Sequence, residues 1–150
     1  MSGGFDNEIA VLSPVRPDGT LTTIYRPETN GFVGDVDLHW DAERMLFSMP
    51  GANGRWQVCE INSDGSGLRQ VSQMPDDVDC MDACYLPNGN IVFGSTASYQ
   101  SVPCWHGQKR VSNLYVMKAD GSGVRQLCFD QDHDFHPCVL PTGQVLYHRW

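Results

Sequence analysis

The sequence of 150 residues lacks any apolar run near the roughly 20 residues that a membrane-spanning helix needs, so we expect no membrane insertion. Positive charge is scarce, because 10 Lys and Arg stand against 18 Asp and Glu for a formal net charge of −8. Proteins that bind nucleic acid through its phosphates present basic patches, so no nucleic-acid partner is expected. The first residues, MSGGFDNEIAVL, lack a basic segment followed by an apolar one, and no secretory signal is visible there.

Several motifs of catalysis and cofactor binding are also missing. There is no CxxCH, so haem is not expected within this chain, and no CxxC pair occurs among the six cysteines. Walker A, GxGxxG and GxSxG motifs are absent. Cys104 with His106 or His133 could form a Cys–His pair, but nothing around Cys104 resembles a protease signature, so no catalytic residue is predicted.

The sequence does contain an internal repeat. The block DGSGxRQ at 64–70 returns at 120–126, and LPNGNIVFGS returns as LPTGQVLYHRW. Met45, Ile91 and Val145 share one register, at intervals of 46 and 54 residues, and the second interval is longer because residues 96–112 are an insertion. A repeat of this length is typical of propellers and solenoids.

Each repeat consists of short runs rich in Val, Ile, Leu, Tyr and Phe, separated by turn sequences. Asp-Gly-Ser-Gly predicts a tight hairpin, in which Asp caps the turn and Gly supplies a positive φ. No helical periodicity of useful length is present. We therefore expect strands at residues 8–15, 21–26, 36–40, 44–49, 56–62, 68–72, 82–86, 90–95, 113–119, 124–128, 137–140 and 144–150.

Four short antiparallel strands per repeat of about 45 residues is typical of a β-propeller blade. The predicted fold is therefore all-β, with two complete four-stranded blades and two half-blades within residues 1–150. Their bounds are 8–26 for the first half-blade, 36–72 for the first blade, 82–128 for the second blade with its insertion at 96–112, and 137–150 for the last half-blade.

This number of blades is below the roughly four to eight of a closed propeller. The prediction is a fragment of a larger propeller, in which the remaining blades belong to a longer chain. The alternative is an open arc that associates with copies of itself, since free strand edges invite pairing.

The units SDGSGLRQVS and ADGSGVRQLCFD, each followed by an Asp-rich loop and a Pro-x-Gly turn, resemble TolB-type propeller repeats. The second half, from LPNGNIVFGSTASYQSVPCWHG to the end, is similar to the propeller-containing middle region of hydrazine synthase alpha subunit-like proteins. The likeness covers roughly residues 8–150. It implies a larger, exported, periplasmic or extracellular protein. The haem-bearing parts of the family would then lie outside this stretch, or this relative never had them.

A zinc site is the first candidate site. Cys104 and His106 lie in the insertion, and His133 and His136 lie in the Asp/His-rich loop after the second DGSG hairpin. The inserted hairpin and this loop belong to one blade and could converge, and thiolate plus imidazole suits tetrahedral zinc. In the family, a Val-Pro-Cys element and a residue just before a Pro stand where Cys104 and His136 stand here. The alternative is that these residues are a free thiol and hydrogen-bonded loop histidines.

The Asp-rich loop and Trp105 each have two possible interpretations. Asp130, Asp132 and Asp134 alternate as in a calcium loop, but the EF-hand Gly and Glu positions hold Phe135 and Pro141, so a solvated acidic loop is favoured. Trp105, between Cys104 and His106, is either a contact residue on the propeller face or a cover for the insertion.

We therefore predict a non-catalytic binding or scaffold module, with a protein or small-molecule ligand at the propeller face. One alternative is a segment of a multidomain haem and zinc enzyme that contributes metal ligands. The other is a self-assembling structural module. Propellers host many functions, so the repeat alone does not choose among the three.

Overall fold

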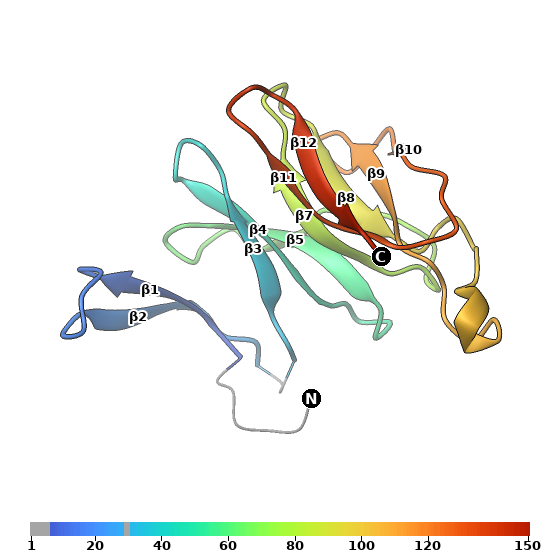
Figure 1. Ribbon diagram of the computed structural model, residues 1–150. Coiled ribbons are helices and arrows are strands. Elements are labelled where there is room, and N and C mark those ends of the chain that lie inside the picture. The colour runs from blue at the N-terminus through green and yellow to red at the C-terminus, as the bar shows by residue number, and fades with distance from the viewer. Residues whose placement is uncertain (1–6, 29–30) are drawn as a thin grey trace.

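The computed structural model describes residues 7–28 and 31–150 (Figure 1). The predicted range of 1–150 thus includes residues 1–6 and 29–30, which lie outside the described residues. The described part is all-β, and its strands form two four-stranded and two two-stranded antiparallel sheets, which confirms the predicted fold class.

The sheets follow one another along the chain, and the strands of each are hydrogen-bonded in sequence order. The strands are β1 (Ile9–Ser13) and β2 (Thr20–Tyr25) in the first sheet, β3 (Gly34–Leu38), β4 (Arg44–Pro50), β5 (Trp56–Asn62) and β6 (Arg69–Gln70) in the second, β7 (Cys80–Tyr85), β8 (Ile91–Ser95), β9 (Asn113–Met117) and β10 (Arg125–Gln126) in the third, and β11 (Asp134–Val139) and β12 (Val145–Arg149) in the fourth.

The outer hairpin of each four-stranded sheet turns as the DGSG sequence predicts. The Asp64 carboxylate accepts a hydrogen bond from the Ser66 amide at 2.9 Å, and Asp120 accepts the equivalent bond from Ser122, also at 2.9 Å. Because both amides are satisfied by the side chain two residues earlier, the turn is fixed locally, before any contact with another blade.

Neighbouring sheets pack face to face through separate core layers. Leu46 and Val58 of the second sheet pack with Phe93 and Tyr115 of the third. A second layer joins the first two sheets, and a third joins the third sheet to the last hairpin. This arrangement of successive sheets, each packed on the next, is that of propeller blades (Figure 1).

The first strands of three successive blades lie next to one another, β7 between β3 and β11. Hydrogen bonds join them across the blade boundary: the Tyr85 amide donates to Asp37 at 3.0 Å, and the Asp82 amide donates to Ser48 of β4 at 3.1 Å. We call β3, β7 and β11 the inner strands.

The inner strands begin two or three residues earlier than the sequence indicated. Each contains a β-bulge, because the register shifts between Gly34 and Asp37 in β3 and at the matching places in β7 and β11. At the bulges, Asp35, Asp82 and His136 have positive φ values of 55°, 53° and 49°. A bulge breaks the alternation of side chains on which strand prediction depends.

The insertion differs from the expected hairpin. It closes through a single bridge between Ser101 and Arg110 and contains a short 3-10 helix, η1 (Pro103–Trp105). Proline at 103 has no N–H to donate, and His106 and Gly107 both have positive φ, so a regular ladder cannot continue. Within the described residues, no helix is long and apolar enough to cross a membrane.

Candidate functional site

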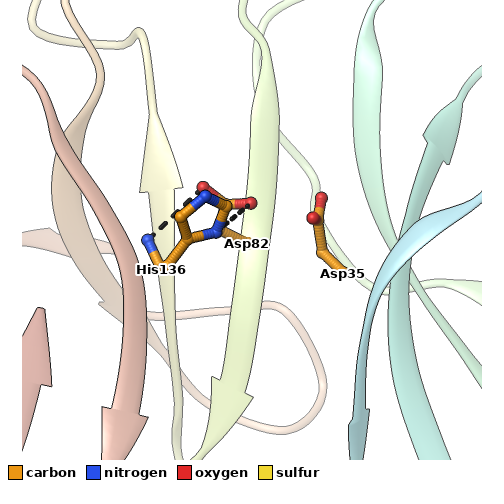
Figure 2. Close-up of side chains that lie close together, drawn as sticks. All are labelled: Asp35, Asp82 and His136. Carbon is orange, nitrogen blue, oxygen red and sulfur yellow. Dashed lines mark hydrogen bonds and ion pairs between the residues drawn. The ribbon is translucent and has the colours of Figure 1, made fainter. Parts of the chain in front are cut away.

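A polar cluster lies on the inner strands. Asp35 of β3, Asp82 of β7 and His136 of β11 each place one ligand-type atom within 4.8 Å of the other two (Figure 2). Three successive blades thus contribute one residue each, and all three residues sit at the bulges. We call these three residues the inner-strand cluster.

Asp82 is the buried member of the inner-strand cluster, with only 5% of its side chain exposed. One of its oxygens lies 3.3 Å from Nδ1 of His136, and the other accepts a bond from the His136 amide at 3.5 Å. Burial, together with the smaller effect of the negative charge of the neighbouring Asp35, raises the pKa of the Asp82 carboxyl to about 6.

The charge of Asp82 is balanced differently from that of two other carboxylates, buried Asp134 and half-buried Glu60. Asp134 lies 2.9 Å from the Arg149 guanidinium, and Glu60 lies 2.5 Å from that of Arg69. Among the described residues, Asp82 has no Lys or Arg partner, and its one ion-pair partner is His136. The inner-strand cluster is therefore rich in negative charge and short of positive charge.

The structure places the four sequence-predicted zinc residues in different surroundings. His136 belongs to the inner-strand cluster, whereas Cys104 and His106 are exposed in the insertion. Nδ1 of His133 accepts a bond from the Ser112 amide at 3.1 Å, and burial lowers its pKa, so this imidazole is neutral with only Nε2 free. Among the described residues, the inner-strand cluster is the one group of three or more close ligand atoms, and zinc at Cys104, His106, His133 and His136 stays a prediction.

The Asp-rich loop is neutralised from within the protein. Arg149 of β12 contacts Asp130 at 2.5 Å and Asp134 at 2.9 Å, and Asn113 donates to the carbonyl oxygens of Asp130 and Asp132, each at 3.2 Å. These contacts offset the negative charge of the acidic loop where it packs against β9.

The insertion and the Asp/His-rich loop do come together. Between them lies a groove of about 770 Å³, which we call the insertion groove. Its apolar and aromatic lining is Met81, Val102, Trp105, Phe135 and Trp150, and its polar lining is Arg55, Asp79, Thr96, Gln108, Lys109, Arg110, Ser112 and His133.

The insertion groove is locally cationic in an acidic protein. Three of the chain's ten Lys and Arg residues line it. Arg55 pairs with Asp79 at 3.3 Å and Arg110 with Asp77 at 2.7 Å, whereas Lys109 has no ion pair among the described residues. The groove therefore offers an uncompensated positive charge beside exposed aromatic rings, a combination suited to an anion with an apolar body.

The insertion also has unused hydrogen-bonding capacity. Three buried side-chain oxygens in the described part of the chain have no partner: those of Ser98, Gln100 and Ser112. All three lie in or at the end of the insertion, and Ser112 also lines the groove. Buried polar groups are normally satisfied, so the insertion is the part of the described chain that is least complete by itself.

A second groove of about 850 Å³ lies at the other end of the inner strands, between the Pro-x-Gly turns. Its polar groups are already engaged within the protein. The Asp37 carboxylate accepts a hydrogen bond from the Tyr85 amide at 3.0 Å, and the His39 imidazole pairs with the Asp41 carboxylate at 2.7 Å. Although it is the larger of these two grooves, it offers a ligand fewer unengaged polar groups than the insertion groove does.

Sequence reasoning missed Asp35 and Asp82, although a signal for them was present. Asp35, Asp82 and His136 are spaced by 47 and 54 residues, close to the intervals of 46 and 54 that relate Met45, Ile91 and Val145. Equivalent residues of neighbouring inner strands must lie close together, so aligning the repeats would have brought these three together.

No family model matches the sequence, and no curated protein matches it. Solved structures do match. A structure assigned to TolB from Agrobacterium tumefaciens has a TM-score of 0.68 at 14% identity, over 88% of this chain and 42% of that one. The chain has the fold of a TolB-type β-propeller segment, and we call it the TolB-like segment.

Two other structures agree. Hydrazine synthase from Kuenenia stuttgartiensis matches the TolB-like segment with a TM-score of 0.69 at 18% identity, over 87% of this chain and 23% of that one. TolB from Acinetobacter baumannii matches with a TM-score of 0.60 at 15% identity, over 94% of this chain and 34% of that one. The TolB-like segment thus spans less than half of each protein, and the resemblance inferred from the repeats is confirmed for the fold.

Proposed function

We propose that the TolB-like segment is a non-catalytic binding module of a larger, exported β-propeller protein, and that its ligand lies in the insertion groove. The observation behind this proposal is the meeting around one groove of exposed Trp105, the Asp/His-rich loop, and Lys109, which has no ion-pair partner within residues 7–28 and 31–150. The ligand class that fits is an aromatic or apolar group with an anionic substituent, on a small molecule or a protein side chain.

The outermost sheets support a larger assembly. Val11 and Leu21 of the β1–β2 hairpin and Leu146 of β12 are exposed, at 46%, 68% and 56%. Elsewhere in the chain, neighbouring sheets cover each other's apolar side chains, so further blades at the two ends would bury these exposed side chains. A second copy of the chain would bury them equally well, and the mass in solution by sedimentation separates the two: a monomer argues against self-assembly.

The groove is tested with indole-3-acetate and its neutral analogue indole-3-acetamide as probes, and binding is measured by saturation-transfer NMR. We expect the anion to bind more tightly than the amide. Trp105→Ala should weaken binding about fivefold, since an aromatic contact contributes ~1 kcal/mol. Lys109→Gln should remove the preference for the anion.

Trp40→Ala is the matched control, because Trp40 is exposed to the same degree as Trp105, 52% against 53%, and lies outside the insertion groove. It should leave binding unchanged. The proposed binding site would be contradicted if Trp40→Ala and Trp105→Ala weakened probe binding equally. It would also be contradicted if the unaltered chain bound both probes equally well.

A further inference from the structure

The geometry points to a metal site separate from the insertion groove: we propose that Asp35, Asp82 and His136 together bind one divalent transition-metal ion, for which Zn²⁺ is the probe. This site lies on the inner strands, and it does not depend on the ligand proposed for the groove. It differs from the sequence-predicted zinc set, with which it shares only His136.

The fold brings the three ligands together. The three residues come from inner strands of three successive blades, and their ligand atoms lie within 4.8 Å of one another. Ligands of one tetrahedral zinc ion lie about 3.3 Å apart, given bonds of about 2.0 Å, so small side-chain rotations close the site. Each residue sits at a bulge with positive φ, a conformation that redirects the side chain from the regular pleat.

The donor atoms of the inner-strand cluster suit a transition metal. Two carboxylates and one imidazole are three ligands for a borderline divalent ion, with a position left for water or another ligand. Calcium instead takes six to eight oxygen ligands, which the inner-strand cluster does not offer. The set therefore favours a transition metal over Ca²⁺.

The negative charge of the inner-strand cluster also favours a cation. Asp82 is buried, Asp35 is close beside it, and within residues 7–28 and 31–150 neither carboxylate pairs with Lys or Arg. Two adjacent carboxylates repel each other, and a divalent cation between them removes the repulsion. Elsewhere in the protein, arginine has this role, as Arg149 does for Asp134.

The inner-strand cluster is accessible to an ion from solvent. Asp35 is exposed, and 62% of the His136 side chain is open to solvent, so an ion can reach Asp82 without unfolding of the sheet. The Asp82–His136 contact of 3.3 Å already orients the imidazole toward the carboxylate that would share the ion.

The test is calorimetric titration of the tag-free 150-residue chain with ZnCl₂ and, separately, with CaCl₂. We expect one Zn²⁺ per chain and no comparable heat with Ca²⁺. Asp82→Asn and Asp35→Asn should each weaken zinc binding at least about tenfold, the usual effect of losing a ligand or its orientation. Circular dichroism checks that the variants are folded, and exposed Asp35 provides a variant that leaves the core intact.

The controls are Cys104→Ala, His106→Ala and Cys138→Ser, which remove other exposed zinc-binding groups. All three should bind zinc as the unaltered chain does. The proposal is overturned if the unaltered chain does not bind zinc, or if Asp35→Asn and Asp82→Asn both keep full zinc affinity. It is also overturned if Cys104→Ala or His106→Ala loses zinc binding. Trp105→Ala should keep zinc binding, so failure at the groove and failure at the metal site are distinguishable.

Discussion

At the scale of single residues, Asp82 is placed at a cost to stability. Its carboxylate is buried beside Asp35, without the arginine that Asp134 or Glu60 has. An acid whose pKa is raised in the folded state makes the protein less stable as the pH rises through that range. For Asp82 this window runs from about 4, the ordinary value, to about 6.

Asp82→Asn is therefore expected to stabilise the metal-free protein at pH 7.5. Asparagine keeps an oxygen for the His136 amide and removes the buried charge. The expected gain is on the order of 1–2 kcal/mol, or a few degrees in Tm, and it should shrink at pH 4.5, where the carboxyl is largely neutral. Thermal melts at both pH values measure it; a fall in Tm at pH 7.5 would contradict this view of Asp82.

The six cysteines divide by burial, and we expect their reactivity to divide in the same way. Burial raises the pKa of Cys59 and Cys80 to about 11 and of Cys84 to about 12. Since the thiolate is the reactive form, these three should resist iodoacetamide at pH 8 until the protein unfolds. Exposed Cys104 and Cys138 should react first, as mass spectrometry of native and denatured samples would show. Rapid native modification of Cys84 would contradict the described packing.

At the scale of elements, the outer DGSG hairpins act as contacts between blades. Gly65 and Gly121 both have φ of 85°, and a Cβ at either position would collide with a carbonyl oxygen of the preceding blade, that of Ile24 or Val71. Arg69 extends the contact, since it donates to the Ala119 carbonyl of the next blade at 3.0 Å and pairs with Glu60. The recurring DGSGxRQ block thus connects blades as well as turning the chain.

Gly121→Ala is expected to be more destabilising than Gly89→Ala. Both glycines have positive φ, 85° and 81°, but nothing lies within 4 Å of a Cβ at Gly89. Gly89→Ala should cost about 1 kcal/mol for the backbone conformation alone, and Gly121→Ala should cost about 1–3 kcal/mol more for the collision with Val71. Urea denaturation of the two variants measures the difference; equal losses would argue against docking of the hairpin on the preceding blade.

The elements themselves were largely predictable from the sequence, and the site was not. Apolar runs between Asp-Gly and Pro-x-Gly turns fixed the strand order, because turn chemistry is local. The bulges at Asp35, Asp82 and His136 were missed, since they break the alternation of side chains. The sequence indicated that the insertion and the Asp/His-rich loop could converge. It did not indicate that Arg55 and Met81 line the insertion groove, because their positions depend on how separate blades pack.

At the scale of the whole molecule, the TolB-like segment has one groove at each end of its inner strands. The inner strands place the inner-strand cluster and, beyond one end of it, the insertion groove, whose lining includes Met81 and Phe135, the sequence neighbours of Asp82 and His136. The groove between the Pro-x-Gly turns lies at the opposite end. A binding module that uses the insertion should therefore respond to ligand at one end only.

Amide chemical-shift mapping of the ¹⁵N-labelled chain with indole-3-acetate tests this claim most directly. We expect saturable shifts confined to the insertion groove, at residues 102–112 and 133–135 together with Met81 and Trp150. Residues 86–89 and 140–143, which line the opposite groove, should not move. Shifts centred on those turns, or on the exposed β1–β2 hairpin, would contradict the assignment of the insertion groove as the binding site.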